Sequence, residues 1–177
     1  MNNTLLLYST TDGHTIKIIE RMAARLKQQA FDVQMMPIAQ ATQAQIARAD
    51  KIVVGASVRY GKHKKEVNQF IDTYIASLNS KPSAFFSVNV VARKAEKNTS
   101  ETNPYLQKFL SKIEWQPALL GVFGGMLAYP EYGLVDKTMI RLIMKMTDGP
   151  TDPDTVIDYT DWEKVDKFAD KVAALSL

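Results

Sequence analysis

Thr4-Leu5-Leu6-Leu7-Tyr8-Ser9-Thr10-Thr11-Asp12-Gly13-His14-Thr15 is the stretch that says most about the architecture of this chain. Its first five residues form a short apolar run that is typical of a buried strand. The polar residues that follow lead into an amphipathic helix, whose apolar residues are Ile16, Ile19, Ala23 and Leu26. A buried strand followed by such a helix is the first half of a βαβ unit, and it predicts a parallel sheet.

The same alternation continues along the chain. Apolar or β-branched runs at 31–36, 51–56, 83–90 and 119–123 predict four more strands. Amphipathic or Ala-rich segments at 40–49, 67–78, 104–113 and 162–172 predict the remaining helices. Asn103 is expected to cap one of them, and Thr160 with Glu163 to form a capping box for the last. The pattern predicts an open, doubly wound α/β sheet with ligands bound beyond the carboxyl ends of the strands.

The chain has 177 residues, and we expect a single domain over residues 1–177. Residues 126–158 stand out, because this connection is about twice the usual length and carries its own helical pattern. We therefore expect an insertion over 126–158, before the last helix, that serves the function.

Composition excludes several kinds of site. The chain has no cysteine, which excludes disulfides, thiolate nucleophiles and iron–sulfur clusters, and its two histidines are too few to predict a metal site. A net charge of +3 suits anionic small molecules, phosphates or an anionic membrane surface, but is too small to indicate nucleic acid. The N-terminus does not resemble a secretory signal, and the longest apolar stretch, 118–129, is too short to span a bilayer.

Two loops follow predicted strands and are candidates for a ligand site. Residues 9–15 combine hydroxyls, a glycine and the start of a helix, which suits a phosphate group. They lack the pattern of a P-loop and of a dinucleotide fingerprint, and an ordinary hydroxyl-rich helix start remains the alternative. Residues 57–61 offer an aromatic ring, a guanidinium and a glycine, which suits a flat ring system with polar edges, or else an ordinary surface turn. A receiver domain is disfavoured because acidic residues are missing at the ends of the first and third strands.

Several longer strings carry a resemblance that extends over essentially the whole chain. They are Gly55-Ala56-Ser57-Val58-Arg59-Tyr60-Gly61, Pro82-Ser83-Ala84-Phe85-Phe86-Ser87-Val88-Asn89, Val91-Ala92-Arg93-Lys94, Met139-Ile140-Arg141-Leu142-Ile143-Met144-Lys145-Met146 and Tyr159-Thr160-Asp161-Trp162-Glu163. Together with the 9–15 loop, these strings are similar to the bacterial quinone-dependent protoporphyrinogen IX dehydrogenases. That family consists of flavodoxin-like FMN proteins of haem (porphyrin) biosynthesis.

The resemblance implies a flavodoxin-like three-layer sandwich with a five-stranded parallel sheet in the order 2-1-3-4-5. It implies an oxidoreductase that removes six electrons from protoporphyrinogen IX, giving protoporphyrin IX, and passes them to menaquinone or ubiquinone. It also implies a peripheral protein on the cytoplasmic face of the cell inner membrane. Carried over by position, the FMN-binding residues are Ser9, Thr10, Thr11, Asp12, Gly13 and Thr15 at the phosphate, and Ser57, Val58, Arg59, Tyr60, Gly61, Ser87, Val88 and Asn89 at the ring.

Flavin chemistry suggests roles for particular side chains. We expect Arg59 to place a cation near the flavin edge and Tyr60 to stack on the ring or cover its edge, so both are the catalytic candidates. Tyr60, His63 and water remain open as proton acceptors. Arg93, Lys94 and Lys97 form a basic cluster that is expected to receive the substrate carboxylates, unless it is only a solvated loop.

The predicted helix inside 126–158 has two further features. Lys137, Arg141 and Lys145 recur every four residues as a basic stripe, and most of the residues between them are apolar. This combination is typical of a helix that lies on anionic lipid near a quinone pool. The alternatives are a helix packed on the domain and a contact in a homo-oligomer.

Two other functions are compatible with the same fold. A flavodoxin-type electron carrier is disfavoured, because such carriers are usually strongly acidic and lack an insertion of this kind. A flavodoxin-like quinone reductase fed by NAD(P)H stays an alternative: no segment is typical of a nicotinamide site, but a transient docking site would leave little trace in the sequence.

Overall fold

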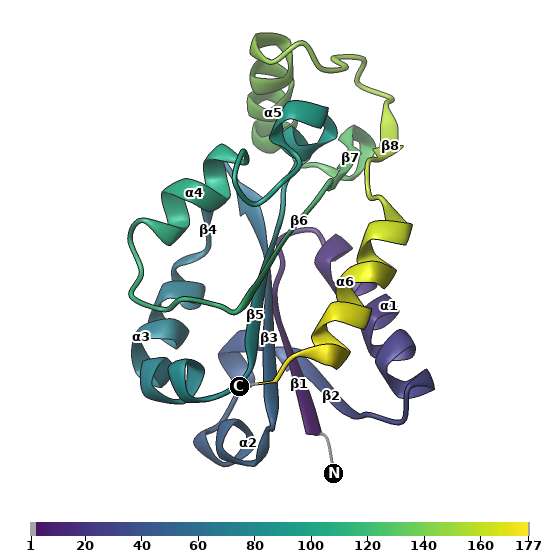
Figure 1. The fold of residues 1–177 in the computed structure, drawn as a ribbon. Helices are drawn as coiled ribbons and strands as arrows, with labels where there is room; N and C mark the ends of the chain where they lie inside the picture. Colours follow the sequence, from purple (N-terminus) through teal and green to yellow (C-terminus); the bar gives the residue numbers. More distant parts are fainter. Residues whose placement is uncertain (1–2, 177) are drawn as a thin grey trace.

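A parallel β-sheet forms the centre of the computed structural model, which describes residues 3–176 (Figure 1). The strands are β1 (Asn3–Ser9), β2 (Asp32–Pro37), β3 (Lys51–Arg59), β4 (Lys62–His63), β5 (Ser83–Val88), β6 (Leu119–Phe123), β7 (Met126–Ala128) and β8 (Val156–Asp158). The α-helices are α1 (His14–Gln28), α2 (Gln43–Arg48), α3 (Lys65–Ser80), α4 (Pro104–Leu110), α5 (Leu134–Met146) and α6 (Trp162–Ala174). Short 3-10 turns η1 (Ile38–Gln40), η2 (Val90–Arg93), η3 (Ala95–Lys97) and η4 (Tyr129–Glu131) complete the elements.

The strand order of the main sheet is β2-β1-β3-β5-β6, with every neighbouring pair parallel. Counting only these strands, the order is the expected 2-1-3-4-5, so the predicted fold is confirmed. The additional strand β4 was not predicted, and it pairs antiparallel with the end of β3. The turn between them places Tyr60 and Gly61 at positive φ, 51° and 74°. This conformation is unstrained for glycine but unfavourable for tyrosine, so the hairpin fixes Tyr60 in place beside the strand ends.

Both faces of the sheet are packed with aromatic side chains. In Figure 1 helices α1 and α6 cover one face, and α2, α3 and α4 cover the other. On the first face Phe86 contacts Phe123 and Phe168, with ring centroids 5.3 and 5.9 Å apart. A Cβ on Gly55 would lie 2.1 Å from the Phe86 ring, so only glycine fits beneath it. Burying each large apolar side chain in this way stabilises the fold by roughly 1.5–3 kcal/mol.

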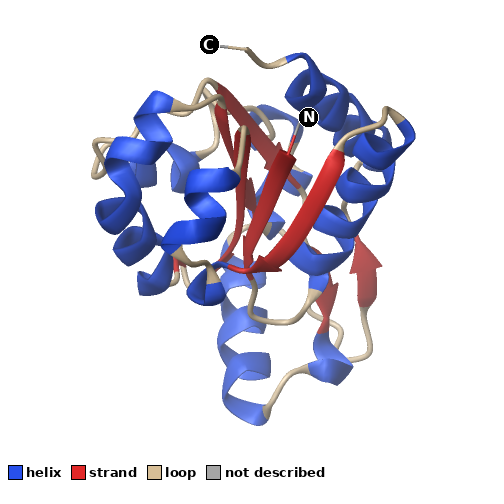
Figure 2. Cartoon of the chain, turned by 90° about the horizontal axis from the view of Figure 1, so that it is seen from below, coloured by secondary structure: helices blue, strands red, loops and turns tan. Residues whose placement is uncertain are grey.

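Residues 126–158 form a separate layer beyond the carboxyl ends of the strands (Figures 1 and 2). Strands β7 and β8 pair antiparallel, and α5 lies between them in the chain. The layer has its own small core of Leu127, Tyr129 and Met144. None of the helices described over residues 3–176 is long and apolar enough to cross a bilayer.

The caps of two helices test the predicted boundaries. Asn103 caps α4 as expected, since its side chain accepts a hydrogen bond from the Leu106 amide. The predicted capping box at the last helix is wrong: Asp161 caps α6, and its carboxylate accepts from the Lys164 amide. Thr160 therefore keeps its hydroxyl for another partner, and donates it to the Gly124 carbonyl over 2.8 Å. This bond ties the end of β6 to the end of the insertion.

Candidate functional site

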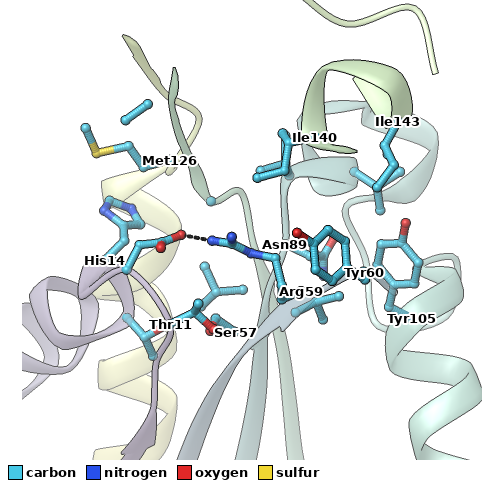
Figure 3. A pocket seen from close by; sticks show the side chains of 18 of the residues that line it. Thr11, His14, Ser57, Arg59, Tyr60, Asn89, Tyr105, Met126, Ile140 and Ile143 are labelled. Atoms are coloured by element: carbon cyan, nitrogen blue, oxygen red, sulfur yellow. Dashed lines mark hydrogen bonds and ion pairs between the residues drawn. The ribbon is translucent and has the colours of Figure 1, made fainter. Parts of the chain in front are cut away.

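A pocket opens at the carboxyl ends of β1, β3 and β5, and the insertion forms its far wall (Figure 3). The residues of the pocket come from five segments of the chain. They are Thr10, Thr11, Asp12, His14 and Thr15; Ser57, Val58, Arg59, Tyr60 and Gly61; Val88, Asn89, Val90, Val91 and Arg93; Tyr105; and Gly125, Met126, Ala128, Glu131, Tyr132, Ile140, Ile143, Met144 and Thr147. Both loops singled out from the sequence thus meet in one pocket.

The loop between β1 and α1, which the sequence predicts to hold a phosphate, forms one end of the pocket, called the phosphate end below. Gly13 takes a left-handed conformation, with φ of 86°, and its amide donates to the Thr10 hydroxyl over 2.9 Å. The Thr15 hydroxyl is fully buried and has no hydrogen-bond partner within residues 3–176. A buried hydroxyl without a partner is costly, and here it stands at the start of a helix, where the backbone N–H groups favour an anion.

The donor set fits FMN. Hydroxyls and helix amides at the phosphate end could donate hydrogen bonds to phosphate oxygens. The Ser57 hydroxyl is a second buried group with no partner in the described part of the chain. Residues 57–61 and 88–91, which include those predicted to hold the flavin ring, also line this pocket. The site carries hydrogen-bond donors for both parts of the cofactor.

Three of the predicted cofactor residues support the pocket from beneath instead of lining it. Ser9 is buried, and its hydroxyl donates to Glu66 Oε1 over 2.6 Å. Gly13 shapes the loop through its backbone. Ser87 is fully buried, and accepts a hydrogen bond from the Asn89 side chain over 3.1 Å.

The polar network under Asn89 explains how that loop is held. The Asn89 Oδ1 atom accepts hydrogen bonds from Asn103 Nδ2 and from the Ala92 amide, at 3.0 and 3.1 Å. His63 Nε2 lies 3.0 Å from Ser87 Oγ, with its ring packed edge-on against Phe85 and Phe109. Burial lowers the pKa of His63 to about 4, so the ring is neutral at pH 7. His63 does not line the pocket, and its contacts are those of a supporting group.

Arg59 connects three parts of the site. Its guanidinium pairs with Asp12 of the phosphate loop (dashed line at Arg59 in Figure 3). It also lies 3.1 Å from Asp136 Oδ2 of α5. The Tyr60 hydroxyl donates to the other oxygen of Asp136, and this hydrogen bond raises the pKa of Tyr60 above its usual value. The two catalytic candidates therefore share one carboxylate, which belongs to the insertion.

The predicted substrate cluster divides in the structure. Arg93 lines the pocket, but its guanidinium also donates to the Thr147 and Val90 carbonyls, at 2.7 and 3.2 Å. Lys94 and Lys97 are half-buried and stand outside the pocket lining. These contacts make Arg93 a link between η2 and the end of α5.

Helix α5 presents three different faces. Ile140, Ile143, Met144 and Thr147 follow an i, i+3, i+4, i+7 spacing and line the pocket. Val135, Leu142 and Met146 lie on an outer apolar face and are 74%, 52% and 77% exposed. Arg141 and Lys145 are exposed and Lys137 is half-buried on a basic side.

Sequence reasoning missed much of the pocket wall. The inner face of α5 could have been found from its spacing, because one face of an amphipathic helix has to meet the domain. Tyr105, Tyr132 and His14 gave no such signal, since single aromatic residues and a lone histidine occur in any loop or helix start.

Comparisons with known proteins agree with this geometry. A model of the flavodoxin domain family matches residues 5–154. Protoporphyrinogen IX dehydrogenase (quinone) of Escherichia coli strain K12 is 43% identical over 173 residues, which cover 98% of this chain and 96% of the relative. The protein of the same name from Leishmania major is 43% identical over 174 residues, covering 98% of this chain and 75% of the relative.

Solved structures resemble the chain in fold. An archaeal flavodoxin has a TM-score of 0.58 at 18% identity, and covers 97% of this chain and 96% of its own. A WrbA-like flavodoxin from Agrobacterium tumefaciens has a TM-score of 0.56 at 15% identity, with 98% and 96% covered. At these identities the likeness establishes the fold alone.

Proposed function

We propose that this chain oxidises protoporphyrinogen IX to protoporphyrin IX, with FMN as cofactor and a quinone as acceptor. The proposal proceeds from its family: the chain belongs to the flavodoxin domain family and, within it, to the quinone-dependent protoporphyrinogen IX dehydrogenases. The observation that carries the proposal is 43% identity over 98% of the chain. The pocket supports it, because a phosphate loop, a ring loop and an apolar wall meet there.

Thr10, Thr11 and Thr15 with the first turn of α1 would hold the phosphate of FMN, and residues 57–61 and 88–89 would hold its ring. FMN bound there would supply a two-electron acceptor, so a six-electron oxidation would need three rounds of flavin reduction and reoxidation by the quinone. Arg59 contributes a cation whose charge Asp12 and Asp136 balance. The phenol of Tyr60 is protonated at pH 7, and its hydrogen bond to Asp136, which raises its pKa further, holds the ring beside Arg59.

The wall opposite the strand ends suits a large apolar substrate. Ile140, Ile143 and Met144 of α5 line the pocket. Tyr105 lies beside Tyr60, on the same side of the view as Ile143 (Figure 3). A flat tetrapyrrole or quinone ring buries apolar area against such side chains, and methionine adapts its shape to either. We propose that the propionates of the substrate meet Arg93 in the pocket lining, with Lys94 and Lys97 outside the lining but next to it in the chain.

The proposal is tested by a visible spectrum of the protein mixed with FMN and desalted, before and after anaerobic protoporphyrinogen IX. A retained flavin spectrum that bleaches with this substrate, and recovers with a quinone, is the expected result. A spectrum that bleaches with NADPH instead indicates a reductase, and one that bleaches with neither indicates an electron carrier. A matched Thr15→Val variant keeps the shape of the side chain but lacks its hydroxyl, and should retain less FMN.

We further propose that the protein lies peripherally on the cytoplasmic face of the cell inner membrane, with α5 against anionic lipid. The support is the outer apolar face of α5, with Val135, Leu142 and Met146, and the cations Lys137, Arg141 and Lys145 beside it. Each cation near an anionic surface contributes about 1 kcal/mol, and the exposed apolar side chains add to this by burial. The inner face of the same helix lines the pocket, so a quinone dissolved in lipid would have a short path to it.

Sedimentation with vesicles of anionic and of neutral phospholipid tests the membrane proposal. Wild-type protein should sediment with anionic vesicles, and a combined Lys137→Glu, Arg141→Glu and Lys145→Glu variant should sediment much less. A matched triple variant of exposed lysines on other helices, Lys17→Glu, Lys108→Glu and Lys171→Glu, changes the net charge equally and should still sediment. Light scattering decides whether the apolar face instead joins two copies of the chain, in which case mass doubles and lipid binding is absent.

A further inference from the structure

His14 has an unusual position for a titratable side chain. It is the first residue of α1, it lies between two residues of the phosphate loop, and it lines the pocket (Figure 3). Its side chain is only 10% exposed. The other polar groups of this loop are mainly hydroxyls and backbone amides, which do not titrate near pH 7.

The contacts of the His14 ring fix which nitrogen carries hydrogen. Nε2 lies 2.6 Å from Thr160 Oγ1 and 3.3 Å from Asp158 Oδ1. The Thr160 hydroxyl already donates its hydrogen to the Gly124 carbonyl, so its oxygen accepts from Nε2–H. A neutral ring with Nε2–H has a bare lone pair on Nδ1.

Nδ1 is the unusual atom. It is buried and has no hydrogen-bond partner over residues 3–176. The adjacent Thr15 hydroxyl is likewise buried and unpartnered. Two neighbouring polar groups without partners, both at the phosphate end of one pocket, indicate that the ligand provides their partners.

The surroundings of His14 keep its ring neutral before the ligand binds. Burial lowers its pKa below the usual 6.5, and Lys17 on α1 acts in the same direction. Asp158 at the end of β8 acts against them, while Thr160 and the Trp162 ring of α6 are uncharged neighbours. A phosphate dianion near the ring would add a second negative charge and favour the protonated form.

Resting on the proposed FMN site, we propose that His14 takes up one proton from solvent when FMN binds, and that the new Nδ1–H donates a hydrogen bond to a phosphate oxygen. The protonated ring then bridges the phosphate to Thr160 and Asp158. FMN binding and the position of the insertion are thereby joined through one side chain.

The sign of the resulting pH dependence follows from linkage. FMN binds with a proton, so its affinity rises as pH falls, by up to about tenfold for each pH unit while one proton is taken up. Below about pH 6 the phosphate itself becomes protonated, which opposes this rise. The informative range is therefore pH 6.5 to about 8.5.

Calorimetric titration of the flavin-free chain with FMN, in two buffers of different protonation enthalpy at pH 7.5, counts the protons directly. Uptake of between one half and one proton per FMN is expected for the wild type, and none with riboflavin, which lacks the phosphate. His14→Gln keeps an amide donor for Thr160 but cannot titrate; it should bind FMN about tenfold more weakly at pH 6.5, with no uptake. His63→Gln is the matched control, because His63 is neutral in this range, and it should keep the uptake of the wild type.

The outcomes separate the inference from the function it rests on. Equal proton uptake by wild type and His14→Gln, or none in either, would overturn the role of His14 while leaving FMN binding intact. Failure of the wild type to bind FMN at all would overturn the proposed function as well. Nitrogen-15 spectra of the histidine rings give a second readout, since the chain has only two histidines: the His14 Nδ1 signal should change from bare to protonated when FMN is added.

Discussion

The parallel sheet and the insertion over residues 126–158 use apolar residues in opposite ways. In the sheet, Leu6, Val53 and Phe86 are fully buried between two layers of helices. In the insertion the buried core consists of Leu127, Tyr129 and Met144, while α5 exposes an apolar face to the outside. Nearly every apolar residue of the first region therefore stabilises the fold, whereas many in the second remain free to meet a ligand or a surface.

This difference assigns stability and recognition to different parts of one small chain. Regions with few buried contacts open at low free-energy cost, and binding surfaces are commonly found in them. The sheet holds the phosphate loop and the ring loop at fixed positions. The insertion supplies Asp136, the pocket wall and the exposed helix face.

The largest effect is expected in the sheet. Phe86→Ala removes a fully buried ring that contacts Phe123 and Phe168, and leaves a cavity above Gly55. We expect the free energy of unfolding to fall by about 3–5 kcal/mol, measured by urea denaturation followed by circular dichroism. Phe86→Leu keeps much of the volume and should cost distinctly less. A loss below about 1 kcal/mol would mean that the sheet does not carry the stability of the chain.

A pH effect of intermediate size is expected from His63, which also belongs to the sheet region. Its pKa is lowered from 6.5 to about 4, so the unfolded chain binds more protons than the folded chain between these values. The contribution of neutral His63 to the free energy of unfolding is fully present above pH 6.5. As pH falls toward 4 this contribution is lost, which lowers the free energy of unfolding by up to about 3 kcal/mol. Urea unfolding at several pH values measures the loss. The slope between pH 6.5 and 4 should be smaller in His63→Gln, and an equal slope would assign the acid sensitivity to other groups.

The sheet was predictable because its residues repeat one pattern. Runs such as Lys51–Ala56 and Ser83–Val88 are apolar and β-branched or aromatic, and a five-fold alternation with helices leaves few topologies open. Strands β4, β7 and β8 have only two or three residues, too few for any period to be visible. The cap of α6 was misassigned because Thr160 and Asp161 are both good capping residues, and tertiary contacts with Gly124 and His14 decided between them.

The pocket was predictable where it follows strand ends and less so elsewhere. Residues 9–15 begin at the last residue of β1, and residues 57–61 include the end of β3 and the turn after it, so parallel pairing of these strands brings them together. Tyr105 and Ile140 enter the pocket from α4 and α5, and Asp136 of α5 contacts Arg59 of the pocket lining. Their approach depends on how those helices pack, which no local pattern encodes.

Arg59 tests how strongly the two regions depend on each other, because it pairs with Asp12 on the sheet side and with Asp136 on α5. Arg59→Ala should weaken FMN binding about tenfold, or about 1.4 kcal/mol, since the cation at the flavin edge is lost and two carboxylates are left unpaired. Fluorescence titration of FMN measures the change. Asp136→Asn keeps the cation and should weaken FMN binding less. Unchanged FMN binding and unchanged turnover in Arg59→Ala would remove the proposed role of this residue.

The smallest effect on the free energy of unfolding is expected from a substitution in the insertion, at Tyr129, although its ring is buried as deeply as that of Phe86. Tyr129 is fully buried, and its hydroxyl donates to the Pro150 carbonyl over 2.7 Å. Tyr129→Ala should lower the free energy of global unfolding by less than about 1 kcal/mol, because the sheet keeps all its contacts when the small core of the insertion opens. The same variant should greatly increase hydrogen exchange of the amides in 126–158, with the sheet amides unaffected. If instead Tyr129→Ala lowers the free energy of global unfolding as much as Phe86→Ala, the two regions unfold as one cooperative unit. Helix α5 with its exposed apolar face then belongs to a rigid part of the chain, and not to one that opens locally.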